Sequence, residues 1–215
     1  MIRPSIKNSE MDVIAESVLL KAVIPISWEG KVSRINIDSI IEFTYDLEIS
    51  WENIDHLSND GVILAAINPK NKIIYMNETQ KDLFTKNVGT MNFSKAHELG
   101  HWILHVTKQR DYEQISFLEG ETYLCRGGLK KPPEEFQADM FAASILMPKK
   151  IITGAINLLK EREKITFPVL YRLANEFEVS ISALTNRLRE LNLLYIKEKT
   201  IYMSKAEATG QLSLI

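Results

Sequence analysis

The residues best suited to chemistry in this chain lie in one short run, residues 96–105, which holds three of its four histidines. His97 and His101 are four residues apart, so on a helix their imidazoles project from the same face, one turn apart. Both can then reach a single zinc ion at about 2.0–2.1 Å. Glu98 directly follows the first of them and is placed to act on a metal-bound water. The H-E-x-x-H pattern therefore predicts a zinc site built for hydrolysis.

The local sequence favours the helix that this pattern needs. We expect Ser94 to cap its start, and apolar residues then recur at helical spacing as far as Val106. Gly100 costs about 1 kcal/mol against alanine inside a helix, so we expect a neighbour to pack closely there, such as a strand bordering a substrate cleft. No break signal lies between His97 and His105, which are about 12 Å apart along a regular helix. His105 is therefore expected to pack behind the site or to hold a ligand in place.

The third metal ligand is expected from a second helix, which lies between Pro133 and Pro148. Glu134 and Glu135 compete for this role, because both faces of the helix continue into apolar residues. Asp139 favours Glu135, because it lies one turn further along the same face. A buried carboxylate at that position can orient a zinc-bound imidazole. The alternative is that Glu135 and Asp139 are only exposed charges at the start of the helix.

Two segments of the chain, residues 93–105 and 135–148, resemble the ImmA/IrrE family of metallopeptidases. That family pairs an A-H-E-L-G-H helix with a downstream helix of the pattern E-x-x-A-(N/D)-x-F-A-A-x-x-L-M-P. Both patterns are present here in that order, and we expect the resemblance to extend over about residues 40–193. A match to both patterns is far more specific than a match to H-E-x-x-H alone.

The resemblance implies a role for each residue of the site. His97, His101 and Glu135 fall on the family's metal ligands, and Glu98 falls on its general base. The core of the family is similar to that of thermolysin-like enzymes, which agrees with Asp139 as the carboxylate behind a ligand imidazole. Members of the family cut, or promote the loss of, a helix-turn-helix repressor, and so release mobile-element or stress-response genes.

The composition is that of an ordinary globular protein. The 215 residues, 45% hydrophobic and 25% charged, suffice for one sizeable core and a small second module. A net charge of −2 gives no overall attraction to nucleic acid or to an anionic membrane. No apolar run approaches the roughly 18 residues of a membrane span, and the first residues lack the apolar core of a signal peptide. The single cysteine, Cys125, excludes an internal disulfide and is treated as a bystander. We therefore expect a cytoplasmic protein.

Hydrophobic spacing predicts helices ahead of the metal site, at residues 9–20 and at residues 38–45 with Asp38 as the cap. Strands are predicted at three places: residues 47–51, 61–68 and 72–77. The last two form a hairpin, whose edge either binds an extended substrate by backbone hydrogen bonds or is purely structural. Residues 110–129 are predicted to be a long loop, which is a lid, an insert that reads the substrate, or merely a poorly ordered segment.

The C-terminal part predicts a helix at residues 149–161 and then two helices within residues 167–191. The last two are joined by a tight turn at residues 178–180, with Ser180 capping the second helix, which is the outline of a helix-turn-helix. Five basic residues face four acidic ones between residues 168 and 199, so there is no basic stripe. We favour a structural or substrate-docking module over a DNA-reading one.

Together these features predict an α+β fold, with a mainly helical zincin-like metallopeptidase core, a small β-sheet or hairpin, and a C-terminal helix-turn-helix-like module. The predicted division is a metallopeptidase domain at residues 1–150, a helical module at residues 151–199 and a tail at residues 200–215.

The predicted activity is that of a zinc endopeptidase that cleaves a helix-turn-helix repressor, with Mn²⁺ as a substitute metal in vitro. The group that stabilises the oxyanion is left open among four side chains: Tyr112, Tyr123, Tyr171 and His105. One alternative is a DNA- or partner-binding regulator whose zinc site is structural or weakly active, but such a site has no need of Glu98. Another is a toxin-like peptidase that cuts many proteins.

Overall fold

The computed structural model describes residues 6–57, 62–106, 132–197 and 199–210. The architecture is α+β, as the sequence predicts: mainly helical, with a three-stranded sheet and a two-stranded hairpin. The helices are α1 (Asn8–Lys21), α2 (Ile37–Ser39), α3 (Lys81–Lys86), α4 (Val88–His101), α5 (Pro133–Leu146), α6 (Lys149–Arg162), α7 (Phe167–Phe177), α8 (Ile181–Glu190) and α9 (Lys205–Thr209). The strands are β1 (Glu48–Glu52), β2 (Ala65–Asn68), β3 (Ile73–Asn77), β4 (Tyr195–Lys197) and β5 (Thr200–Tyr202).

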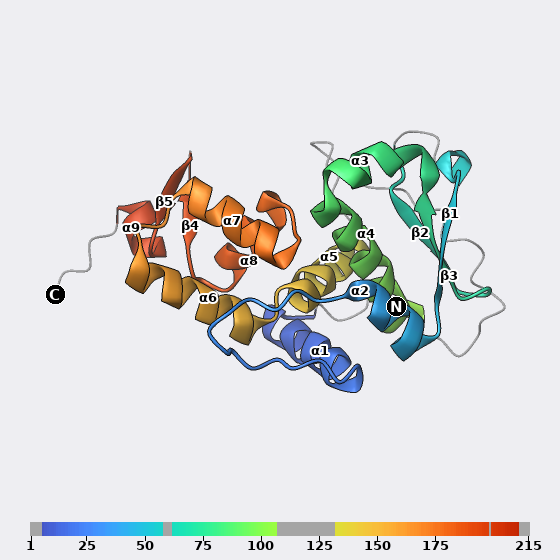
Figure 1. The fold of residues 1–215 in the computed structure, drawn as a ribbon, viewed down its shortest axis with the longest axis horizontal. Coiled ribbons are helices and arrows are strands. Elements are labelled where there is room, and N and C mark those ends of the chain that lie inside the picture. Colours follow the sequence, from blue (N-terminus) through green and yellow to red (C-terminus); the bar gives the residue numbers. More distant parts are fainter. Residues whose placement is uncertain (1–5, 58–61, 107–131, 198, 211–215) are drawn as a thin grey trace.

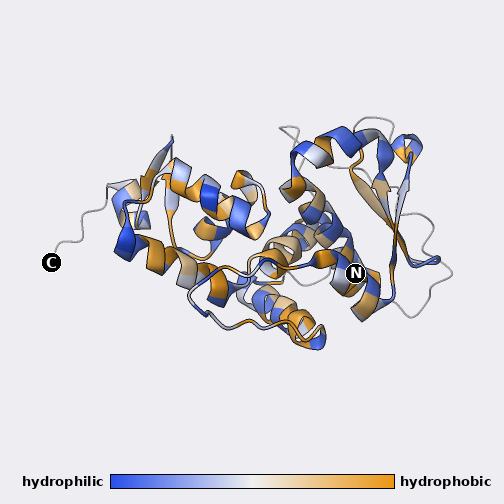
Figure 2. Cartoon of the chain, viewed as in Figure 1, coloured by the Kyte–Doolittle hydropathy of each residue, from blue (hydrophilic) through white to orange (hydrophobic). Residues whose placement is uncertain are grey.

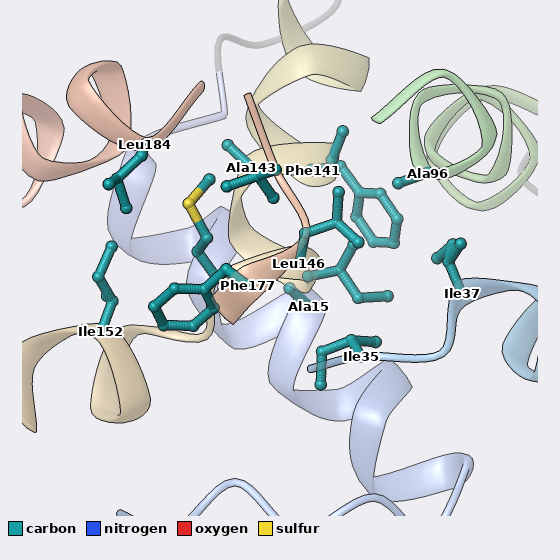
Figure 3. Packing of buried hydrophobic residues seen from close by; sticks show 14 of the residues in the cluster. Ala15, Ile35, Ile37, Ala96, Phe141, Ala143, Leu146, Ile152, Phe177 and Leu184 are labelled. Carbon is teal, nitrogen blue, oxygen red and sulfur yellow. The ribbon is translucent and has the colours of Figure 1, made fainter. Parts of the chain in front are cut away.

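Helix α5 lies at the centre of the molecule (Figure 1). The three-stranded sheet, α3 and α4 lie on one side of it, and the elements from α6 onward lie on the other. Buried apolar residues from both sides form one cluster. In Figure 3, side chains from α1, α4, α5, α6, α7 and α8 converge around Phe141 and Leu146 of α5. Figure 2 shows hydrophobic and hydrophilic bands alternating along α6 and α7, as expected of helices with one buried face.

The three-stranded sheet has the order β1-β3-β2, with β1 parallel and β2 antiparallel to β3. The predicted hairpin is present, but its first strand begins at Ala65 and is shorter than expected. Just before β2 the backbone amide of Asn77 still donates to the carbonyl oxygen of Leu64, at 2.9 Å. The side chain of Asn77 is fully buried, and its Nδ2 donates to the carbonyl oxygen of Ile63 at 2.8 Å. Strand β2 lies at the edge of the sheet.

The expected helix caps at Asp38 and Ser94 are wrong. Asn36 caps α2, with its Oδ1 accepting from the Ser39 amide at 3.2 Å. Asp38 instead accepts two hydrogen bonds from Nζ of the buried Lys95, at 2.8 and 2.9 Å. Ser94 lies inside α4, which begins at Val88, and its hydroxyl donates to a backbone carbonyl one turn earlier. A buried lysine and a longer helix were not visible in the local pattern.

The helix predicted at residues 38–45 is also modified, because after Ser39 the backbone continues as a π-helical turn, Ile40–Thr44. Gly89 lies in the first turn of α4. A Cβ there would lie 2.4 Å from the carbonyl carbon of Val179, so only glycine lets the turn between α7 and α8 approach the helix this closely. The N-terminal part of α4 is thereby packed against the C-terminal half of the chain.

The two C-terminal helices follow the predicted outline. Glu178 ends α7 in the left-handed conformation, with φ 52°, and the Ser180 hydroxyl accepts from the Ala183 amide at 3.1 Å to cap α8. The interpretation of this pair as a helix-turn-helix module stays a prediction.

In the described part of the chain, no single helix is long and apolar enough to cross a membrane. Among the described helices, only α5 and α6 together have the length and the apolar composition of a membrane span, and they meet at a 60° bend.

Arg187 fixes α8 to the core. Its side chain is 1% exposed and forms an ion pair with Asp12 of α1, and its Nε donates to the carbonyl oxygen of Met147 at 3.3 Å. This arginine therefore points inward and is not part of the outer surface of α8. One charged side chain connects α1, the end of α5 and α8.

We predict that Arg187→Met lowers the free energy of unfolding by about 3–5 kcal/mol, because it leaves the carboxylate of Asp12 buried without a counter-charge. Urea denaturation followed by circular dichroism measures this change. Arg189→Met, on the exposed face of the same helix, should change stability by less than about 0.5 kcal/mol. The double variant Arg187→Met/Asp12→Leu should recover most of the loss, and an equally unstable double variant would contradict the explanation.

Candidate metal centre

Two helices bring three metal-binding side chains together. Helix α4 carries His97 and His101, whose Nε2 atoms lie 3.0 Å apart, and α5 carries Glu135. The two carboxylate oxygens of Glu135 lie 3.2 Å from His97 Nε2 and 3.1 Å from His101 Nε2. One ligand atom from each residue lies within 4.8 Å of the others, so the three form a candidate metal-binding group.

The residues present fit a small divalent ion. Ligands 2.0–2.1 Å from a tetrahedral zinc ion lie about 3.4 Å apart, slightly more than the separations between these atoms. Two neutral imidazoles and one carboxylate are a donor set that suits zinc and other first-row divalent metals. Three protein ligands leave a fourth position open, which is typical of catalytic rather than structural sites.

Of the two candidate carboxylates, Glu135 is the one that contacts both histidines. Burial by itself would raise the pKa of Glu135, but its close contacts with His101 and His97 outweigh it and hold the pKa well below its usual range. Burial would lower the pKa of His97, but hydrogen bonds to Asp139 and Glu135 and the charge of Glu98 raise it to about 10. The carboxylates around His97 therefore favour a positive charge at this position.

Asp139 lies one turn after Glu135 on α5 and accepts a hydrogen bond from Nδ1 of His97 at 2.9 Å. This fixes the ring so that its Nε2 faces Glu135 and His101. The expectation that Asp139 is buried is wrong, because 36% of its side chain is exposed. Its position at the rim lets solvent stabilise the charge while the carboxylate holds the imidazole.

Glu98 is almost completely buried on α4, next to the histidines. Burial raises its pKa, and the nearby charges of His97 and His101 only partly oppose this. Its carboxylate accepts a hydrogen bond from the backbone amide of Ile67 in the edge strand β2. No local sequence pattern indicates this contact, because it depends on how the sheet packs against α4. A carboxylate with a raised pKa beside a metal-binding group is well suited to carry a proton.

The interval between His97 and His105 does contain a change of helix, contrary to expectation. At Trp102 the α-helix passes into a π-helical turn, Trp102–Val106, which carries His105. His105 is 5% exposed, and its Nδ1 lies 3.1 Å from Nδ1 of His101, on the opposite side of the ring from Glu135. Its Nε2 lies 3.2 Å from Oε1 of Gln137 on α5. His105 is thus packed behind His101.

Gly100 marks the closest approach of α4 to its neighbour, but the neighbour is a helix and not the expected strand. A Cβ at Gly100 would lie 3.1 Å from Phe141 Cδ1 and 3.2 Å from Ala138 Cα, both on α5. The strand prediction failed because the glycine signals only a close contact and not which element makes it. The small residues at this crossing let the two metal-binding helices approach each other.

Several predicted positions do not contribute to the described site. Tyr112, Tyr123, Cys125 and the predicted loop at residues 110–129 lie outside the described residues. Tyr171 is 54% exposed on α7. The choice of an oxyanion-stabilising group therefore stays open.

Comparison with known proteins agrees with this arrangement. One protein family, described as Peptidase M78, IrrE N-terminal-like domain, matches residues 45–189. A solved structure of a Mycobacterium tuberculosis transcriptional regulator has a similar fold, with a TM-score of 0.50 and 14% sequence identity. The similar region covers 84% of this chain and 48% of that one, so this chain spans about half of its length. No curated protein matches the chain.

We predict that Gly100→Ala destabilises the protein by up to about 2 kcal/mol. Overpacking of a tight contact costs about 1–3 kcal/mol, and the better helix propensity of alanine returns only about 1 kcal/mol. Two of the three atoms that the new Cβ would meet belong to the backbone of α5, so a side-chain rotation cannot relieve the contact. Urea denaturation measures the change, with Ser94→Ala on the same helix as the control. Increased stability of Gly100→Ala would contradict this prediction and would mean that the helices separate freely.

Proposed function

This chain belongs to the Peptidase M78 (IrrE N-terminal-like) family, and we propose that it is a zinc-dependent endopeptidase. The observation that carries the proposal is the convergence of His97, His101 and Glu135, from two helices, beside a buried Glu98. We assign the first three as the metal ligands and Glu98 as the general base. A structural zinc site would have four protein ligands and no need of a buried carboxylate beside them.

Zinc is the metal that best suits two imidazoles and a carboxylate, with Mn²⁺ as a substitute in vitro. When bound, it would polarise the scissile carbonyl and make water more acidic. The protein supplies the remaining parts of the reaction. His97 and His101 present their Nε2 atoms, and Asp139 keeps the ring of His97 in the binding orientation.

Glu98 is proposed to accept the proton of the attacking water and then to deliver it to the leaving amine. Its raised pKa supports this role, because burial makes this carboxylate hold a proton more readily than an exposed glutamate does. The amide of Ile67 holds the carboxylate beside the edge strand β2. An extended substrate that pairs with this edge would be placed next to both Glu98 and the metal-binding group.

The proposed substrate is a helix-turn-helix repressor, as the family resemblance implies, and the proposed location is the cytoplasm, where such repressors act. The fold neighbour from M. tuberculosis is named a transcriptional regulator, which agrees with a role in gene control. We propose that residues 1–150 form the peptidase domain, and that the helical module at residues 151–199 docks the substrate. The buried position of Arg187 supports docking over DNA reading, because it removes a positive charge from the outer surface of α8.

We predict that Glu98→Gln still binds one zinc ion but cuts at least about 100-fold more slowly, because the amide cannot accept the proton. The measurement is cleavage of a helix-turn-helix repressor incubated with the protein, followed by mass spectrometry, together with zinc content. Glu135→Gln should lose zinc, whereas Glu134→Gln, one residue earlier, should keep both zinc and activity.

Each outcome of that experiment bears on one assignment. Cleavage by Glu98→Gln at the wild-type rate would refute the general base. A wild-type protein that binds no zinc would refute the metal centre. Cleavage of many unrelated proteins would favour a toxin-like peptidase over a repressor-specific one.

A further inference from the structure

A second line of buried side chains lies behind His101. His101, His105 and Gln137 are 7%, 5% and 6% exposed. The Nδ1 atoms of the two histidines lie 3.1 Å apart, and Nε2 of His105 lies 3.2 Å from Oε1 of Gln137. The three side chains form a continuous hydrogen-bonded line that runs from α4 through the π-helical turn to α5.

The chemistry of the end group sets the order of the protons along this line. An amide oxygen only accepts hydrogen bonds, so the proton of His105 must lie on Nε2. In the neutral imidazole, Nδ1 of His105 is then an acceptor, and it can only accept from Nδ1–H of His101. With its proton on Nδ1, His101 has a free lone pair on Nε2, the atom that faces Glu135.

The opposite amide orientation would give the opposite result. A Gln137 that donated its NH₂ group would require a lone pair on Nε2 of His105, and so a proton on its Nδ1. That proton would point at Nδ1 of His101 and would force the proton of His101 onto Nε2. A histidine protonated on Nε2 cannot bind a metal through that atom. The orientation found, with Oε1 toward His105, is the one that permits metal binding.

We propose that His105 and Gln137 are positioning residues that keep His101 in the tautomer able to bind the metal. This inference rests on the proposed metal centre. The two ligand histidines are then oriented by different means. The carboxylate of Asp139 orients His97 from the rim of the site. A neutral, buried relay, formed by His105 and Gln137, orients His101. A neutral relay orients the ring without placing a further negative charge in the interior, where an additional charge is costly.

The test compares matched substitutions in the full-length protein, with zinc affinity measured by competition against a chromophoric chelator. His105→Leu removes the acceptor and should weaken zinc binding about 10–100-fold. His105→Asn places Oδ1 where Nδ1 of histidine lies, still accepts from His101, and should bind zinc nearly as tightly as wild type. Likewise Gln137→Met, which removes the acceptor for the proton on Nε2 of His105, should weaken binding. Circular dichroism and thermal unfolding of the metal-free variants check that each one folds.

Equal zinc affinity of His105→Leu and wild type would overturn the proposal, and so would an equal loss in His105→Asn and His105→Leu. A second measurement does not depend on any variant. Long-range ¹H–¹⁵N spectra of the zinc-loaded wild type should show the proton of His105 on Nε2, and a proton on Nδ1 would overturn the proposal.

These outcomes distinguish a failure of the proposed relay from a failure of the proposed metal centre. A wild-type protein that binds zinc, and loses it in Glu135→Gln, supports the metal centre whatever His105→Leu does. A wild-type protein that binds no zinc overturns the metal centre and the relay together.

Discussion

The close packing of α4 against α5 is the constraint on which the rest of the structure depends. Helix α4 carries two imidazoles and the buried Glu98, but the third metal-binding group and both groups that orient the rings come from elsewhere. Because Gly100 has no Cβ, Cα of Ala138 on α5 can lie only 3.2 Å from the position that a Cβ would take. At this separation, Glu135 and Asp139 of α5 contact the histidines of α4. The glycine thus permits a helix separation at which both helices can share a metal.

The buried polar groups around this crossing are paired. Among the described residues, no buried side-chain nitrogen or oxygen lacks a hydrogen-bond partner. Lys95, one turn before Leu99 on α4, is bound by Asp38, and Arg187 is bound by Asp12. A buried charge without a partner is strongly destabilising, so each pair restricts how its helices can move. These ion pairs therefore hold the scaffold at fixed geometry around the candidate metal centre.

The C-terminal helices α7 and α8 pack directly against the metal-binding helix α4. The turn between α7 and α8 lies against Gly89, and Nδ2 of Asn92 donates to the carbonyl oxygen of Glu178 at 3.2 Å. A helix pair fixed in this way shares one hydrophobic cluster with the site. Any protein that docked on these helices would therefore be held at a fixed position relative to α4.

The sequence by itself determined the parts of this protein that depend on local spacing. The four-residue interval between His97 and His101, the apolar stripe around them and the hairpin ahead of them follow from helical and strand periods. The choice of Glu135 over Glu134 followed from Asp139, one turn along the same face, and the structure places both beside the histidines. Only the tertiary structure decided the true caps, the π-helical turn at Trp102, and the contacts of Ile67 and Gln137. Those features depend on which elements meet across the core, and residues far apart in sequence carry no local signal of their distance in space.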